Sequence, residues 1–250
     1  MGKCKITGAG EPLLFMHGAL VSQAMWTPQA AEFSKAFRVI LLDLPAHGST
    51  RDLPGEYTIE ALAEFVIRQL NELKIDRVHV CGHSLGGMVA QQLAAAYAER
   101  VGKLVLAETA FGTNNSLWER IETVFAKPFL QMTPQNMLVD LSAKRYGTRH
   151  LTTGEFIRQE MSRYDHKTSL RVMDAASRYA GKQKLASIQS PTLVLVGEDN
   201  KQTHTQGREM TRLIPEAKLV VIGQASHMLN LDNPEAFNRE VFAHLTAGRL

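Results

Sequence analysis

Long apolar runs, paired cysteines and clusters of positive charge are all scarce in this sequence of 250 residues. No apolar run approaches the roughly 18 residues of a membrane-spanning helix, and residues 1–20 lack the charged head and apolar stretch of a secretory signal. The two cysteines, Cys4 and Cys81, fall in the N-terminal tail and in a predicted buried strand, which argues against a disulfide framework. We therefore expect a cytoplasmic protein with reduced thiols and no association with a membrane.

Strong net charge is also missing, since the formal charge is +3 and the basic residues are scattered. No Lys/Arg cluster is dense enough to indicate binding to nucleic acid. No metal site is predicted from the nine histidines. The stretch "GAGEP" near the start is too short to indicate a phosphate-binding loop, and no cofactor is expected. These absences leave oligomeric state open.

What the sequence does contain is a regular alternation of short apolar runs and helix-period stretches. This alternation is typical of an α/β fold with a mostly parallel sheet covered by helices on both faces. The runs are nearly continuous in Val, Leu and Ile, as expected for strands buried on both sides. The predicted strands are 12–18, 37–45, 77–84, 103–109, 191–199 and 217–223. Apolar stripes predict helices from 59 to 73, from 85 to 96 and from 234 onward, the last with Asn233 as its N-cap.

Residues 113–187 interrupt this alternation, because they contain amphipathic stretches but no convincing strand. The sequence therefore predicts an α/β core formed by 1–112 and 188–250, with 113–187 as a helical cap, or lid, inserted after the strand that ends near residue 109. The apolar side chains of the cap could line a pocket, although for each one packing of the cap onto the core is the favoured interpretation. The side chains concerned are Leu117, Ile121, Val124, Phe125, Met137, Leu138, Leu141, Phe156, Ile157, Met161, Leu170 and Met173.

The segment "VHVCGHSLGGMVA" contains a G-x-S-x-G motif centred on Ser84. A predicted strand enters the motif and a predicted helix leaves it, which is the context of a nucleophile elbow. Gly82 and Gly86 are small because the turn between strand and helix is tight. Alone, the motif is also compatible with an ordinary turn serine, but in this register it predicts a nucleophilic Ser84.

A serine hydroxyl needs a base to remove its proton, and His227 is the strongest candidate. It lies in "GQASHMLNLDNPEAF", in a loop between the last predicted strand and the last predicted helix. From there a side chain can lie over the carboxyl-terminal edge of the sheet, beside Ser84. For the other histidines, which fall in strands, helices or turns, a structural role is the favoured interpretation.

The segments "HGAL" (17–20), "DLPAHGST" (43–50), "GHSLGG" (82–87) and "ASHMLNLDNPEAFN" (225–238) together resemble a lidded serine enzyme of the α/β-hydrolase fold. The resemblance covers nearly the whole chain, with the segments in family order. It implies an oxyanion hole made by the backbone N–H groups of Ala19 and Leu85, with His17 bracing the loop. Ala46 stands where glycine is commoner, and few residues precede the first predicted strand, so we expect one edge of the sheet to be shortened.

The resemblance leaves two candidates for the acid that supports His227. The usual family pattern, G-x-x-D after the penultimate strand, falls on Asn200 when it is counted from Gly197, and Asp199 lies one position early. Glu108 ends the strand before it, in a position that resembles the triad acid of haloalkane dehalogenases and some lipases. Its longer side chain suits that neighbouring strand. Glu108 is the preferred acid, and Asp199 remains the alternative.

The predicted activity is hydrolysis of carboxylic esters or lactones through a Ser-His-acid triad and an acyl-enzyme, with a small-molecule substrate. A carbon–carbon bond hydrolase and a cofactor-free perhydrolase would use the same triad. Haloalkane dehalogenases and epoxide hydrolases are disfavoured because their nucleophile is an aspartate. A ligand receptor on the same fold is the non-enzymatic alternative.

Overall fold

The computed structural model describes residues 4–112, 128, 131–147 and 149–248. Within these residues seven strands form one sheet in the order β1-β3-β2-β4-β5-β6-β7, in which β1 is antiparallel to β3 and the other neighbours are parallel. The strands are β1 (Cys4–Thr7), β2 (Glu11–Met16), β3 (Phe37–Leu42), β4 (Val78–His83), β5 (Val101–Ala107), β6 (Thr192–Gly197) and β7 (Lys218–Ile222). This arrangement confirms the predicted α/β class and the mostly parallel sheet.

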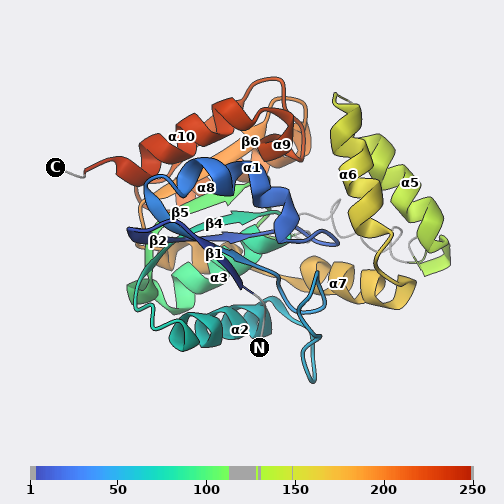
Figure 1. Ribbon diagram of the computed structural model, residues 1–250, viewed down its shortest axis with the longest axis horizontal. Coiled ribbons are helices and arrows are strands. Elements are labelled where there is room, and N and C mark those ends of the chain that lie inside the picture. Colours follow the sequence, from blue (N-terminus) through green and yellow to red (C-terminus); the bar gives the residue numbers. More distant parts are fainter. Residues whose placement is uncertain (1–3, 113–127, 129–130, 148, 249–250) are drawn as a thin grey trace.

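Helices cover both faces of the sheet (Figure 1). On one face α1 packs against α10, and on the other α2 packs against α3, while α8 lies beside β6 and β7. The helices are α1 (Thr27–Phe33), α2 (Ile59–Glu72), α3 (Leu85–Ala96), α5 (Gln135–Tyr146), α6 (Leu151–Met161), α7 (His166–Arg178), α8 (Lys201–Leu213), α9 (Leu229–Asp232) and α10 (Pro234–Thr246), with 3₁₀ turns η1 (Gln23–Trp26), η2 (Ala98–Arg100) and η3 (Lys182–Ser187). Asn233 caps α10 as predicted, because its side chain accepts the N–H of Ala236.

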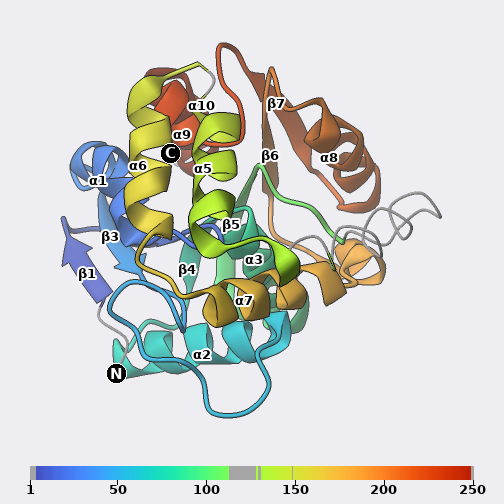
Figure 2. The same ribbon diagram turned by 90° about the vertical axis from the view of Figure 1, so that its right-hand side faces the viewer.

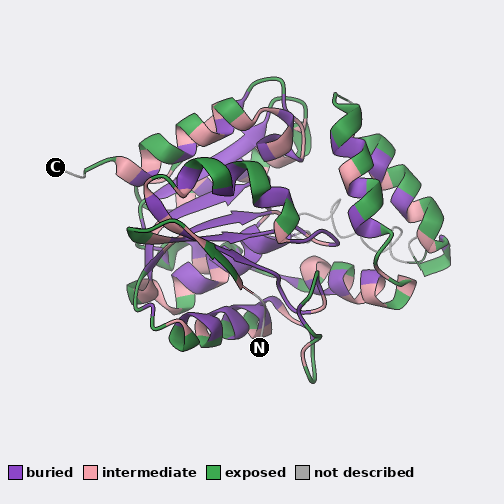
Figure 3. Ribbon diagram, viewed as in Figure 1, coloured by how far each residue is buried: buried purple, intermediate pink, exposed green. Residues whose placement is uncertain are grey.

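The central strands are buried on both sides, whereas the outer faces of the helices are exposed (Figure 3). Between the sheet and the α1/α10 layer, aromatic rings pack around Trp26, whose ring centroid is 4.9 Å from that of Phe15 and 5.8 Å from that of Phe237. The parallel strands β2 to β6 all carry their carboxyl ends to one edge of this rigid core. Loops that follow those ends therefore start from fixed positions.

The helices α5, α6 and α7 are inserted between β5 and β6 and lie beyond that edge (Figures 1 and 2). They occupy the place of the helical insertion predicted after the strand that ends near residue 109, and α5 packs on α6. The predicted amphipathic stretch at Leu117, Ile121, Val124 and Phe125 lies outside the described residues. The division into a core and a cap domain at residues 113 and 187 stays a prediction.

The strand that the sequence did not predict is β1, at the edge of the sheet. Its four residues are partly or fully exposed, and Lys5 and Thr7 interrupt the apolar character, so it shows no buried-strand pattern. A single antiparallel strand therefore extends the sheet beyond β3. Across the described residues, no helix combines the length and the apolar character needed to cross a membrane.

Candidate active site

Ser84 occupies a sharp turn between β4 and α3, with φ of 50° and ψ of −113°. This positive φ is strained for a residue with a side chain, and it persists because the neighbouring backbone holds it. A Cβ at Gly82 would lie 2.3 Å from the carbonyl oxygen of Gly86, and one at Gly86 would lie 2.4 Å from that of Met16. Only glycine fits at either position, so the two glycines of the motif allow the close turn that exposes Ser84 to the cavity above it.

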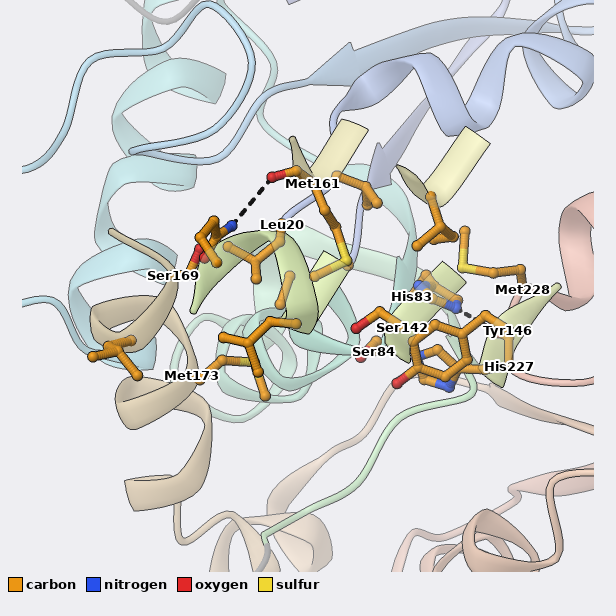
Figure 4. A pocket seen from close by; sticks show the side chains of 17 residues that line it. Leu20, His83, Ser84, Ser142, Tyr146, Met161, Ser169, Met173, His227 and Met228 are labelled. Carbon is orange, nitrogen blue, oxygen red and sulfur yellow. Dashed lines mark hydrogen bonds between the residues drawn. The ribbon is translucent and has the colours of Figure 1, made fainter. Parts of the chain in front are cut away.

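His227 lies in the loop between β7 and α9, and its side chain is 18% exposed. Its Nδ1 is 3.2 Å from Oε2 of Glu108, at the end of β5. The ring lines the same cavity as Ser84 (Figure 4). The structure thus brings together, at one edge of the sheet, a serine, a histidine and a carboxylate that are far apart in the sequence.

The Glu108 carboxylate is completely buried, a costly arrangement for a charge unless hydrogen bonds surround it. One oxygen accepts the backbone N–H of Gly197 at 2.5 Å, and the other accepts Nδ2 of Asn200 at 2.5 Å. The Thr203 hydroxyl lies 3.1 and 3.2 Å from the two oxygens. The Gly197 and Asn200 donors compensate for the lost hydration and hold the carboxylate in place against His227.

Asp199, the alternative acid, faces another direction. Its carboxylate is 37% exposed and forms a two-point ion pair with Arg149, in which one Nη lies 2.8 Å from Oδ1. That guanidinium lowers the pKa of Asp199. Asn200, at the position of the usual family acid, contacts Glu108 instead. The structure therefore brings Glu108, and not Asp199, to the imidazole.

The loop after β2 is braced by two buried histidines. His17 accepts the N–H of Leu44 on Nε2 at 2.9 Å and donates from Nδ1 to the Gly18 carbonyl at 2.7 Å. His47 accepts the N–H of Leu20 on Nε2 at 3.0 Å. Burial lowers the pKa of both rings, that of His47 to about 3, so they are neutral supports at physiological pH.

Of the two predicted oxyanion donors, Leu85 directly follows Ser84, and Ala19 lines the same cavity as Ser84. Leu85 is the first residue of α3, where an N–H has no acceptor within its own helix, and Ala19 lies in the loop braced by the histidines. Within the described part of the chain, neither amide donates to another protein group. A Cβ at Gly18 would lie 3.4 Å from the Ser84 Cβ, so this loop passes close to the serine.

Two aromatic side chains pack on the His227 ring. The Tyr146 ring stacks on it at 4.8 Å between ring centroids, with an angle of 27° between the planes. The His83 ring meets it edge-on at 4.8 Å, and its Nε2 donates to the His227 carbonyl at 2.7 Å. Burial lowers the pKa of His83 to about 3. Both contacts restrict rotation of the imidazole, and sequence reasoning missed Tyr146 because nothing in the spacing of α5 connects it with residue 227.

Above these residues is a cavity of about 150 Å³ beneath the inserted helices. Its lining is mainly apolar and comes from both the core loops and α5, α6 and α7. Five of the amphipathic side chains, for which packing onto the core was the favoured interpretation, line this cavity, and Ile157 and Met161 among them also pack into the hydrophobic core. The five are Leu138, Ile157, Met161, Leu170 and Met173.

The described residues contain no group of three or more His, Cys, Asp and Glu side chains arranged to hold a metal ion.

Comparison with known proteins decides the family. The model of the alpha/beta hydrolase fold family matches residues 11–234. The chain belongs to the alpha/beta hydrolase fold family. As an alpha/beta hydrolase it is 30% identical to the 3-oxoadipate enol-lactonase 1 of Acinetobacter baylyi, over 90% of this chain and 85% of that protein.

Two solved structures are similar over almost their whole length. The enol-lactonase of Burkholderia xenovorans LB400 gives a TM-score of 0.87 at 28% identity, covering 98% of this chain and 96% of that one. A thermophilic esterase of Thermogutta terrifontis gives 0.87 at 26% identity, covering 98% and 92%. The relatives of this alpha/beta hydrolase thus include lactonases and esterases.

Proposed function

We propose that this protein is a serine hydrolase that cleaves carboxylic esters or lactones of small molecules. The observation that carries the proposal is the buried Glu108 carboxylate hydrogen-bonded to His227 in the cavity that Ser84 enters. A carboxylate on Nδ1 fixes the imidazole tautomer and leaves Nε2 to act as a base. The similarity to lactonases and an esterase supports the same class of reaction.

In the proposed mechanism His227 removes the Ser84 proton as Oγ attacks the substrate carbonyl. The negative charge that develops on the carbonyl oxygen is stabilised by the N–H groups of Ala19 and Leu85, each typically worth on the order of 10²–10³ in rate. His227 then protonates the leaving alkoxide, which gives an acyl-enzyme on Ser84. Water, deprotonated by His227, attacks the acyl group and releases the acid with regeneration of the serine.

The inserted helices, in the proposed division the cap 113–187, cover the acyl-enzyme and exclude bulk water from it. This arrangement strengthens the electrostatic interactions around the reacting carbonyl. The apolar lining favours a substrate with an uncharged body next to the scissile bond.

The first experiment is labelling with a fluorophosphonate probe, followed by hydrolysis assays on graded p-nitrophenyl esters, acyl-homoserine lactones and simple lactones. We expect one labelled serine, Ser84, and a loss of turnover on the order of 10⁴-fold or more in Ser84→Ala. Ser187→Ala, which changes an exposed serine outside the cavity, is the matched control and should keep both labelling and turnover. An unlabelled Ser84 in the folded protein would favour a ligand receptor over a hydrolase.

A further inference from the structure

The cavity has a second polar region, formed by Ser169 of α7 and Gln135 of α5. Ser169 is 2% exposed, and its Oγ has no hydrogen-bond partner among the residues that the structure describes. Oε1 of Gln135 is likewise buried without a partner in that part of the chain. Both residues line the cavity, and Figure 4 shows Ser169 on the side opposite Ser84 and His227. The cavity is therefore polar at both ends.

The hydrogen-bonding roles at this far end are fixed by its neighbours. Nε2 of Gln135 donates to the carbonyl oxygen of Met161 at 3.3 Å, and since a carbonyl only accepts, Oε1 is the atom left unpaired. A helical serine often bonds a backbone carbonyl one turn earlier, but the Ser169 hydroxyl does not. The pair thus offers one acceptor and one hydroxyl that can donate.

Buried polar atoms without partners are uncommon in folded proteins, because each loses its hydration without compensation. Here the two atoms lie in the wall of one cavity rather than inside a packed core, so a bound molecule can supply the missing partners. The rest of the lining is mainly apolar, with Leu138, Leu170 and Met173 among its side chains. None of the described residues that line the cavity is Lys, Arg, Asp or Glu.

We propose that Ser169 and Gln135 bind a neutral group that both donates and accepts a hydrogen bond, such as a hydroxyl or a carboxamide, at the end of the substrate remote from the scissile ester. This inference rests on the proposed hydrolase function and names its substrate class. A hydroxyl satisfies both atoms at once, since it donates to Oε1 of Gln135 and accepts from Ser169. A carboxylate can only accept, and it would face the amide oxygen of Gln135 without a nearby cation.

The test compares kcat/KM for pairs of methyl esters that differ only at the remote end. Methyl ω-hydroxyhexanoate is paired with methyl heptanoate, in which a methyl group replaces the hydroxyl, and with monomethyl adipate, which ends in a carboxylate. The comparison is repeated on butanoate and octanoate chains, and with the hydroxyl moved to the alcohol portion of the ester. Acid release is followed by titration.

For the wild-type protein we expect the hydroxyl ester to be preferred over its methyl counterpart by about tenfold at one chain length, the value of one neutral hydrogen bond together with the relief of unpaired atoms. The adipate monoester should be the poorest of the three. In Ser169→Ala and in Gln135→Leu the ratio of hydroxyl to methyl ester should fall towards one.

Ser177→Ala is the matched control, because Ser177 lies on the same helix and its hydroxyl donates to the Asp174 carbonyl at 2.8 Å, outside the cavity. This variant should keep the wild-type ratio. Ser169→Ala should melt no lower than the wild-type protein, since the mutation removes an unsatisfied buried hydroxyl, and this measurement separates lost recognition from lost folding.

The inference would be overturned by equal kcat/KM values for hydroxyl and methyl esters at every chain length, whether the hydroxyl is on the acid or the alcohol portion. In that case a bound water, and not the substrate, would be the partner of Ser169 and Gln135. Hydrolysis without preference therefore contradicts the far-end site alone. A wild-type protein that hydrolyses none of the esters and leaves Ser84 unlabelled contradicts the proposed function as well.

Discussion

The ends of β5 and β6 lie side by side at one edge of the sheet, and each carries an acid in a different state. Glu108 after β5 is fully buried and contacts His227, whereas Asp199 after β6 is 37% exposed and paired with Arg149. The two strands are parallel neighbours, so both acids follow strands that end at the same edge of the sheet. Proximity at the strand end is therefore not enough to make an acid part of the site.

What distinguishes the two positions is the set of donors around them. The β6 end directs Gly197 N–H and Asn200 towards Glu108, and the first turn of α8 adds Thr203. The strand that supplies the acid in the usual family pattern supplies hydrogen-bond donors here. Asp199 has the ordinary surroundings of a surface carboxylate, where an ion pair contributes little because water and salt screen it.

The strongest test of this comparison is Glu108→Gln. The substitution keeps the shape of the side chain but removes the charge that holds the His227 tautomer, and we expect turnover to fall on the order of 10³–10⁴-fold. KM should change much less than kcat, because the residue does not contact the substrate cavity. Steady-state kinetics on the best ester of the panel give the result, and a fall of less than tenfold would contradict the role of Glu108.

A smaller effect is expected when a negative charge is introduced after β6 to replace the one removed after β5. In the Glu108→Gln background, Asn200→Asp places a new carboxylate beside the side chain at position 108. In the wild-type protein, Nδ2 of Asn200 lies 2.5 Å from Oε2 of Glu108. We expect kcat to recover by roughly tenfold, because the new charge is near Nδ1 of His227 but not aligned with it. Asn200→Ala in the same background is the control and should recover nothing; equal activity of the two double variants would show that the β6 end cannot supply the acid.

The smallest effect is expected for Asp199→Asn. The ion pair with Arg149 is exposed, so its removal should leave kcat/KM within about twofold of the wild-type value. The same assay, run at low and high salt, measures it, and a collapse of turnover to the level of Glu108→Gln would reverse the comparison between the two strand ends.

The fold and part of the site could be predicted because, for the buried strands and the serine turn, a short stretch of sequence determines the local structure. Continuous Val/Leu/Ile runs placed six strands, and G-x-S-x-G between strand and helix placed Ser84 at its turn, since the turn itself demands the glycines. β1 was missed because an exposed edge strand carries no buried pattern. Tyr146 and Arg149 were missed because their partners, His227 and Asp199, are distant in the sequence and no periodicity records such a contact.

By itself, the sequence determined the α/β class, the turn that carries Ser84 and the loop that carries His227, because these depend on side-chain size and hydrophobic period within a few residues. Only the tertiary structure decided which acid meets the imidazole, which lid side chains line the cavity and where unpaired polar atoms remain. These outcomes depend on how separate elements pack, and packing sets the direction, burial and hydration of each side chain.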